Sequence, residues 1–192
     1  MHKLITIISS LLIVLFSFFH ATKPTLPPVN NTISTPSIQP STPIGQVTKT
    51  IGCLISGSLP DKACTPGAID PRVTQETVQS TICVKGYTQK VRPPVSVTEK
   101  IKQERMQAYG DTDSLKNYEL DHLIPLELGG CPDCIANLWP EPYNTPLGAH
   151  EKDKVENDLH DRVCNGQLSL TQAQNEIVTD WAAVYKQIQG NK

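Results

Sequence analysis

The segment Tyr118–Arg162 constrains the fold most, because its hydrophobic pattern changes from strand-like runs to a helical period within a short length of chain. Its first run, Tyr118–Ile124, is rich in residues that favour strands. Pro125 and the pair Gly129-Gly130 follow, and these residues are typical of loops. The sequence therefore predicts a short strand that ends in a loop.

A second apolar run and a helical pattern follow this loop. We expect Ile135–Trp139 to form another strand, ended by Pro140 and Pro142, because proline cannot donate a hydrogen bond to a ladder. From Ala149 onwards the apolar residues recur at helical spacing, and Asn165-Gly166 predicts the end of that helix. The apolar residues at this spacing are Val155, Leu159 and Val163. The expected order is strand, loop, strand, helix.

Polar residues that can perform chemistry lie at the joints of this unit: the adjacent pair Asp121-His122, then Asn137 and His150. A histidine can take a proton from water near neutral pH, and a carboxylate with an imidazole can hold a divalent ion. Successive side chains of a strand face opposite ways, so Asp121 and His122 can share a site only where the strand breaks into the loop. An isolated Asp-His pair is common in surface turns, but its order with the loop, the asparagine and the helix favours an active site.

These residues resemble the HNH (His-Asn-His) nucleases, whose core is a ββα-metal finger. The likeness rests on DH followed by IPLELGG, then NLWP, then a helix with an early histidine. A wider likeness, from TPGAIDPRVTQETVQSTICVKGYTQKVRPP to AQNEIVTDWAAVY, is to bacterial exported proteins that carry this core. The resemblance implies an α+β fold with the metal finger at about residues 118–164, flanked by further helices and stabilised by disulfides.

The resemblance also implies a role for each matching residue. His122 would be the general base, Asp121 a metal ligand, and Asn137 the residue that holds the loop and the base in position. A second metal ligand is expected early in the helix, at His150, with Asn144 as the alternative. The implied activity is hydrolysis of phosphodiester bonds in DNA or RNA with one divalent ion, among Mg, Mn, Ca, Zn and Ni. The alternative is a non-catalytic exported binding or structural domain that keeps the ββα scaffold.

The N-terminal residues predict export. Lys3 and the apolar stretch Leu4–Phe19 give residues 1–21 the pattern of a signal peptide that engages the membrane export machinery. The stretch is shorter than the about 20 residues that span a bilayer comfortably, which favours a signal peptide. Phe19 is a poor residue three places before a cut at Ala21, so an uncleaved membrane anchor is the alternative. Residues 22–48 are rich in Pro, Thr and Ser and predict an extended linker. Residues 49–192 then form one domain of a secreted or periplasmic protein.

The charge of this domain opposes tight, non-specific binding to nucleic acid. Lys3 and Lys23 are two of the 17 basic residues, so residues 49–192 hold 15 against all 19 acidic ones. A nucleic-acid substrate would therefore need a local basic strip, and nothing indicates a stable protein partner. Lys152 is either half of a helix-surface ion pair with Glu156 or a contact to the substrate phosphate. Candidates for the strip are Lys85, Lys90, Arg92, Lys100, Lys102 and Arg105.

Six cysteines beyond an export signal predict up to three disulfides. Fifteen connectivities are possible for six cysteines. Proximity in sequence favours Cys53–Cys64 and Cys131–Cys134, which leaves Cys83 to pair with Cys164. The competing hypothesis is a structural zinc, but the chain has only one CxxC pair, so a disulfide at Cys131–Cys134 is favoured.

Other patterns predict the flanking elements. Val73–Ile82 is expected to be a short helix and Cys83–Val91 a strand. Ser96 with Glu99 predicts a capping box for a helix that ends at Gly110, and Ser169 with Gln172 predicts the same for the last helix. In that last helix, we expect Trp181 to be a core residue. Its apolar stripe is Ile177, Trp181, Val184 and Ile188.

Overall fold

The computed structural model describes residues 45–190 as an α+β domain. The predicted signal peptide and most of the predicted linker lie outside the described residues. Within residues 45–190, no helix combines the length and the apolar character that a membrane span requires. The helices are α1 (Tyr87–Val91), α2 (Val95–Tyr109), α3 (Ala149–Cys164) and α4 (Leu170–Gly190), and short 3₁₀ turns connect several elements.

A two-stranded antiparallel sheet lies at the centre of the described chain. Strand β1 (Tyr118–His122) pairs with β2 (Leu138–Pro142) in a register that places Asp121 opposite Trp139 and His122 opposite Leu138. The predicted limits of the second strand were wrong, because a 3₁₀ turn takes up Ile135–Asn137 and the strand runs through both prolines. Pro140 and Pro142 are two residues apart, so both ring nitrogens face the same edge, and in a two-stranded sheet that edge needs no donors.

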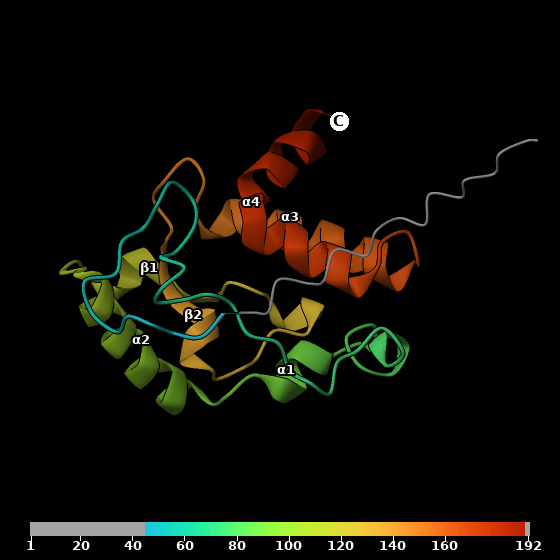
Figure 1. Cartoon of the computed structure of the whole chain (residues 1–192), viewed down its shortest axis with the longest axis horizontal. Helices are drawn as coiled ribbons and strands as arrows, with labels where there is room; N and C mark the ends of the chain where they lie inside the picture. The colour runs from blue at the N-terminus through green and yellow to red at the C-terminus, as the bar shows by residue number, and fades with distance from the viewer. Residues whose placement is uncertain (1–44, 191–192) are drawn as a thin grey trace, which may run out of the picture. The chain divides into compact units, whose positions relative to one another are not determined.

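Helices enclose this hairpin from two sides. Helix α2 contacts both strands and α3 contacts β1, so the hairpin lies between them, and α4 packs on α3 (Figure 1). The helix predicted to begin at Ala149 is confirmed, and its stripe of Val155, Leu159 and Val163 is buried against α4. Helix α3 therefore connects β1, which it contacts on one side, to α4.

The C-terminal helix buries most of its predicted stripe, at Ile177, Trp181 and Val184, although its backbone is kinked at Asp180. Ser169 and Gln172 exchange hydrogen bonds at its start, with Gln172 N donating to Ser169 Oγ at 3.3 Å. Ile177 and Trp181 are fully buried, and the Trp181 indole donates to the Ser58 carbonyl at 2.8 Å. Trp181 is therefore a core residue, as predicted.

The segment before α2 differs from its prediction. Val73–Ile82 forms turns, with a 3₁₀ turn at Val78–Ser80. Cys83–Val91 is not a strand: it begins with a turn and ends with α1. The β-type residues there have no neighbouring strand to pair with, so local turn hydrogen bonds satisfy the backbone instead. Helix α2 begins at Val95 without the predicted cap from Ser96, and it ends at Gly110 as predicted.

All three predicted disulfides are present. Cys53–Cys64 and Cys131–Cys134 close short loops, and Cys83–Cys164 joins the segment before α1 to the end of α3. No free cysteine remains in the described chain. The bridges are consistent with an oxidising compartment.

Candidate active site

Asn137 fastens the loop between the two strands. Its side-chain oxygen accepts from Ile124 N at 2.9 Å, and its amide donates to the carbonyls of Ile124 at 2.9 Å and Cys131 at 3.1 Å. The residue is fully buried, so these bonds also satisfy a polar group that would otherwise be costly to bury. Gly130 is required here, since a Cβ at this position would lie 1.7 Å from the Ile124 carbonyl oxygen.

His122 is the last residue of β1 and is held by the same loop. Its Nε2 lies 2.9 Å from the carbonyl oxygen of Pro132. A carbonyl can only accept, so Nε2 carries the proton of the neutral ring and Nδ1 carries the free lone pair. Burial lowers the pKa of His122, while Pro132 and Asp121 oppose that shift. The result is a neutral imidazole with one nitrogen available as a base.

Asp121 faces the opposite side of the strand and forms a buried ionic network. Its Oδ2 accepts from the Trp139 indole at 2.9 Å and lies 2.9 Å from Lys152 Nζ. Lys152 also donates to the His122 carbonyl at 2.9 Å and pairs with Glu156. The prediction of an exposed Lys152–Glu156 pair was wrong in one respect: the pair exists, but the Lys152 side chain is only 1% exposed.

This burial also decides what Lys152 can contact. Three acceptors surround its ammonium group, which has three hydrogens, so the group is saturated within the protein. Burial lowers the pKa of Lys152, but Asp121 and Glu156 outweigh that effect and raise it, so the ammonium stays charged. Lys152 therefore fixes Asp121 and the end of β1 to α3, and in this arrangement it has no hydrogen free for a substrate phosphate.

Two further glutamates crowd this network. Glu141 is 1% exposed, and neither of its carboxyl oxygens has a hydrogen-bond partner in the described chain. Burial and the charge of Asp121 raise the pKa of Glu141 well above its ordinary value. Burial also raises the pKa of Glu156 to about 8, although Lys152 opposes the shift. The side of β1 that carries Asp121 thus has more carboxyl groups than its one lysine can neutralise.

The predicted second metal ligand lies at the surface. His150 is exposed at the second position of α3, and its ring stacks on Tyr143 with centroids 5.0 Å apart. Asn144, the alternative, is also exposed, in the turn before α3. Asp153, one turn further along α3, is close enough to Asp121 and His150 for their charges to affect its pKa, although burial is the largest cause of its raised value.

The donor set around Asp121 suits a hard divalent ion. Oδ2 carries both contacts of Asp121, and no described residue donates to Oδ1. The buried side-chain atoms without a partner in the described chain belong to Asp111, Glu127 and Glu141, and neither Asp121 Oδ1 nor His122 Nδ1 is among them. Carboxylate oxygens and an excess of negative charge suit such an ion, whereas an imidazole ligand suits Zn or Ni.

Two compact groups of three potential ligands exist elsewhere in the described chain: Cys83 with His160 and Cys164, and Cys131 with Asp133 and Cys134. Each contains a disulfide, so neither presents a thiolate. Asp121 and His150 belong to no such three-ligand group among residues 45–190. An ion at Asp121 would therefore take most of its ligands from water and substrate.

The predicted basic strip is only partly a surface feature. Arg105 is 3% exposed, and it donates to the Leu138 carbonyl at 2.9 Å and to Thr65 Oγ1 at 3.0 Å. It anchors α2 to β2 and cannot contact a ligand. Lys85, Lys90, Arg92 and Lys100 are exposed and Lys102 is partly exposed. Arg92 is near enough to His122 for its charge to oppose protonation of the ring, although burial dominates that pKa shift.

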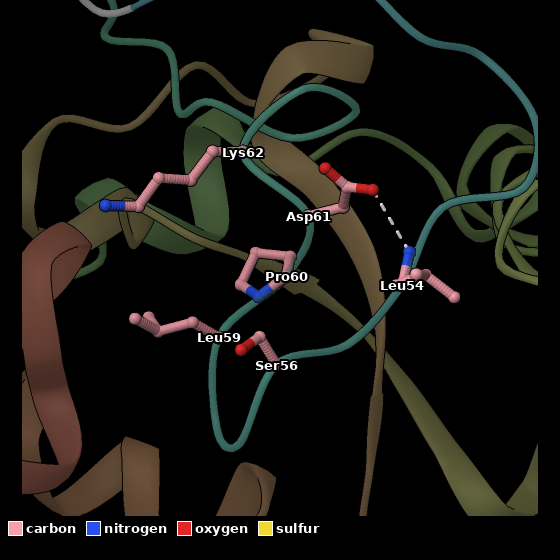
Figure 2. Close-up of a pocket in the computed structure, with 6 residues that line it drawn as sticks. All are labelled: Leu54, Ser56, Leu59, Pro60, Asp61 and Lys62. Atoms are coloured by element: carbon pink, nitrogen blue, oxygen red, sulfur yellow. Dashed lines mark hydrogen bonds between the residues drawn. The ribbon is translucent and has the colours of Figure 1, made fainter.

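A cavity of about 460 Å³ lies away from these residues, against the loop between Cys53 and Cys64. Figure 2 shows Asp61 directed at the Leu54 backbone nitrogen, which donates to its carboxylate at 3.2 Å. The other lining residues are Ser56, Leu59, Pro60 and Lys62. Its lining contains no histidine and no pair of carboxylates, so the predicted chemistry has no counterpart there.

Sequence reasoning missed three contributors to the site: Trp139, Glu141 and the Pro132 carbonyl. Trp139 and Glu141 alternate along β2 and pair with Asp121 and Glu119, so a correct strand register would have placed them on the Asp121 face. The Pro132 carbonyl is a backbone group, and no side-chain pattern could have indicated it.

Comparison with models of known protein families gave no match. Comparisons with curated proteins and with solved structures also gave no match.

Proposed function

We propose that this protein is an exported phosphodiesterase of the HNH type, with a ββα-metal finger formed by β1, β2 and α3. The observation that carries the proposal is the state of His122: a buried, neutral ring whose Nε2 is held by a carbonyl and whose Nδ1 is free. The fastening of the same loop by Asn137 supports it, because a general base needs a fixed position.

In the proposed reaction, His122 Nδ1 takes the proton from the water that attacks phosphorus in DNA or RNA. Asp121 Oδ1 and the His150 imidazole would hold one divalent ion, which when bound supplies positive charge beside the phosphate and leaving oxygens. Lys152 and the Trp139 indole hold Asp121 Oδ2, so that Oδ1 keeps a fixed direction. Lys152 thus acts on the site through Asp121 and not on the phosphate.

A second candidate is a non-catalytic exported domain that keeps this scaffold. Two observations favour it. Asp121 and His122 are only 7% and 6% exposed, and the Asp121 carboxylate is already paired with an ammonium group. A scaffold without catalysis would need Lys152 and Asn137 for stability alone.

The test is cleavage by the oxidised full chain of plasmid DNA and of RNA, in Mg, Mn, Ca, Zn or Ni and with a chelator. We expect cleavage with at least one ion, and His122→Ala should lower its rate by about 10²–10⁴ with the fold intact. His160→Gln is the matched control, because His160 lies on α3 and contacts the Ile82 carbonyl instead. Equal rates for His122→Ala and the parent would remove His122 as the base. If no ion supports cleavage, the nuclease proposal is rejected in favour of the non-catalytic domain.

A further inference from the structure

The loop Cys131–Cys134 carries the only described backbone contact to the His122 ring. Its two cysteines form a disulfide, and the carbonyl of Pro132 between them accepts the bond from His122 Nε2. The CPDC sequence by itself indicates only a disulfide or a zinc ligand pair. Its position against the proposed base gives it a further role.

The two ends of the loop are fixed independently of His122. Cys131 N donates to the Ala68 carbonyl at 2.8 Å, and the Cys131 carbonyl accepts from the Asn137 amide at 3.1 Å. The Cys134 carbonyl accepts from Asn137 N at 2.8 Å. Pro132 and Asp133 between them make no other backbone hydrogen bond in the described chain, and proline has no N–H to offer. The disulfide is therefore the remaining constraint on where the Pro132 carbonyl points.

We propose that the Cys131–Cys134 bridge is a positioning device for His122, and that opening it with a dithiol releases the ring. This rests on the proposed function for its catalytic consequence, but not for its structural one. With the bridge closed, Pro132 O holds Nε2–H and leaves Nδ1 with the free lone pair of the ring. With the bridge open, the four-residue span is free to move the carbonyl away, and the ring loses its fixed orientation.

The redox step balances with a dithiol as the reductant. One thiolate of the dithiol attacks Sγ of Cys134, which is the more exposed of the two cysteines, and the Cys131 thiolate leaves. The second thiolate of the dithiol then attacks its partner sulfur in the mixed disulfide and releases Cys134. The dithiol is oxidised to a disulfide, and the protein gains two electrons and, at the thiols, two protons.

Of the three bridges, this one is suited to act locally. Cys53 and Cys64 are 1% and 0% exposed, so a reductant reaches them only when the fold opens. Cys83–Cys164 joins residues 81 apart in sequence, and its loss would affect the whole domain. Cys131–Cys134 closes a separation of only 3 residues, so the backbone bonds from Ala68 and Asn137 can keep its ends in place without it.

The first test is nuclear magnetic resonance of the His122 ring in the oxidised full chain. The Nε2–H proton should be protected from exchange with water in the parent and in Asp133→Asn, a control at an exposed position of the same loop. In Cys131→Ala/Cys134→Ala its exchange should become at least about tenfold faster, because a ring without its acceptor is open to water. Unchanged exchange in the double variant overturns the proposal.

The second test uses the parent alone, and it covers a double variant that fails to fold. The chain is titrated with dithiothreitol while the Nε2–H signal is followed and alkylated cysteines are identified by mass. The signal should disappear in step with alkylation of Cys131 and Cys134, before the other two bridges open. A signal that persists after both thiols are alkylated contradicts the proposal.

The catalytic consequence is measured separately. The double variant should cleave nucleic acid at least about tenfold more slowly in kcat, with KM nearly unchanged, because the base is misplaced but the substrate surface is not. A changed ring signal in a protein that never cleaves nucleic acid would retain the positioning role and reject the nuclease. An unchanged ring signal in a protein that cleaves nucleic acid would reject the positioning role and retain the nuclease.

Discussion

Asp121 and His122 are neighbours in β1, yet the protein surrounds them in opposite ways. Asp121 faces Trp139, Lys152 and a group of glutamates, and its contacts are ionic. His122 faces a loop with one carbonyl acceptor, and burial keeps its ring neutral. Because alternate side chains leave a strand on opposite faces, β1 holds a charged carboxylate on one face and a neutral imidazole on the other, and the proposed site requires the two to meet where β1 ends at His122.

Substitutions on the Asp121 face and on the His122 face of β1 should therefore have different effects. On the Asp121 side, removing one charge leaves its partner buried and unpaired, so the free energy of unfolding should fall. On the His122 side, removing the ring leaves no buried charge, so turnover should fall more than stability.

The largest effect on stability is expected for Lys152→Met. This change leaves Asp121 and Glu156 without their ammonium partner, and it should lower the free energy of unfolding by about 3–5 kcal/mol. Lys154→Met is the control on the same helix, because the Lys154 side chain is half exposed and its loss should change the free energy of unfolding very little. Urea unfolding at pH 7 measures both.

A double-variant cycle sharpens this prediction. At pH 7 Asp121 is the carboxylate left unpaired in Lys152→Met, since the pKa of Glu156 is raised to about 8. Adding Asp121→Asn removes it and should recover part of the loss. If Lys152→Met and Lys154→Met were equally stable, the buried network would have no energetic role, and the contrast between the two sides of β1 would disappear.

The position of Lys152 shows where sequence reasoning succeeded and where it stopped. The α3 stripe was predicted correctly from Val155, Leu159 and Val163, and Lys152 lies three residues before Val155 on that same face. That spacing was a usable signal for burial, but a charged residue with an i,i+4 glutamate also fits a surface pair. Only the contact with Asp121, which is 31 positions away in sequence, distinguishes a buried Lys152 from one in a surface ion pair.

The distinction between local signals and distant contacts also explains which other parts of the fold were predicted correctly. Elements with a clear period or a capping pair, such as α3 and α4, were predictable because their signal is local. The disulfides were predictable because two of the pairs are close in sequence, and the remaining two cysteines then form the third pair. The strand predicted at Cys83–Val91 was wrong because a strand exists only when a partner pairs with it, and the pairing partner is not encoded locally.

An intermediate effect is expected for Glu141→Gln, and it should depend on pH. Because burial raises the pKa of Glu141 above 4.5, the folded protein keeps a proton that the unfolded chain loses as pH rises past that value. The parent should therefore lose stability from about pH 4.5 upwards, until the pH passes the folded pKa. The variant, whose side chain does not titrate, should exceed the parent in stability at pH 8 and differ little from it at pH 4.

Denaturant unfolding at pH 4, 6 and 8 measures this difference. Glu104→Gln on α2 is the control, because Glu104 is exposed and touches no part of the network. If the stability gap between parent and Glu141→Gln did not widen with pH, Glu141 would be ionised at little cost, and the Asp121 side would be less crowded with charge than its geometry indicates.

The smallest effect is expected at the edge of the Asp121 side, at the proposed second metal ligand. His150 is exposed and stacked on Tyr143, so His150→Ala should leave stability unchanged and weaken binding of a divalent ion by about fivefold, since water can replace one ligand. Calorimetric titration with Mn and Mg measures this, and excess ion should restore most of the lost activity. Asn144→Ala is the matched comparison in the preceding turn: if it loses the ion and His150→Ala does not, Asn144 is the ligand.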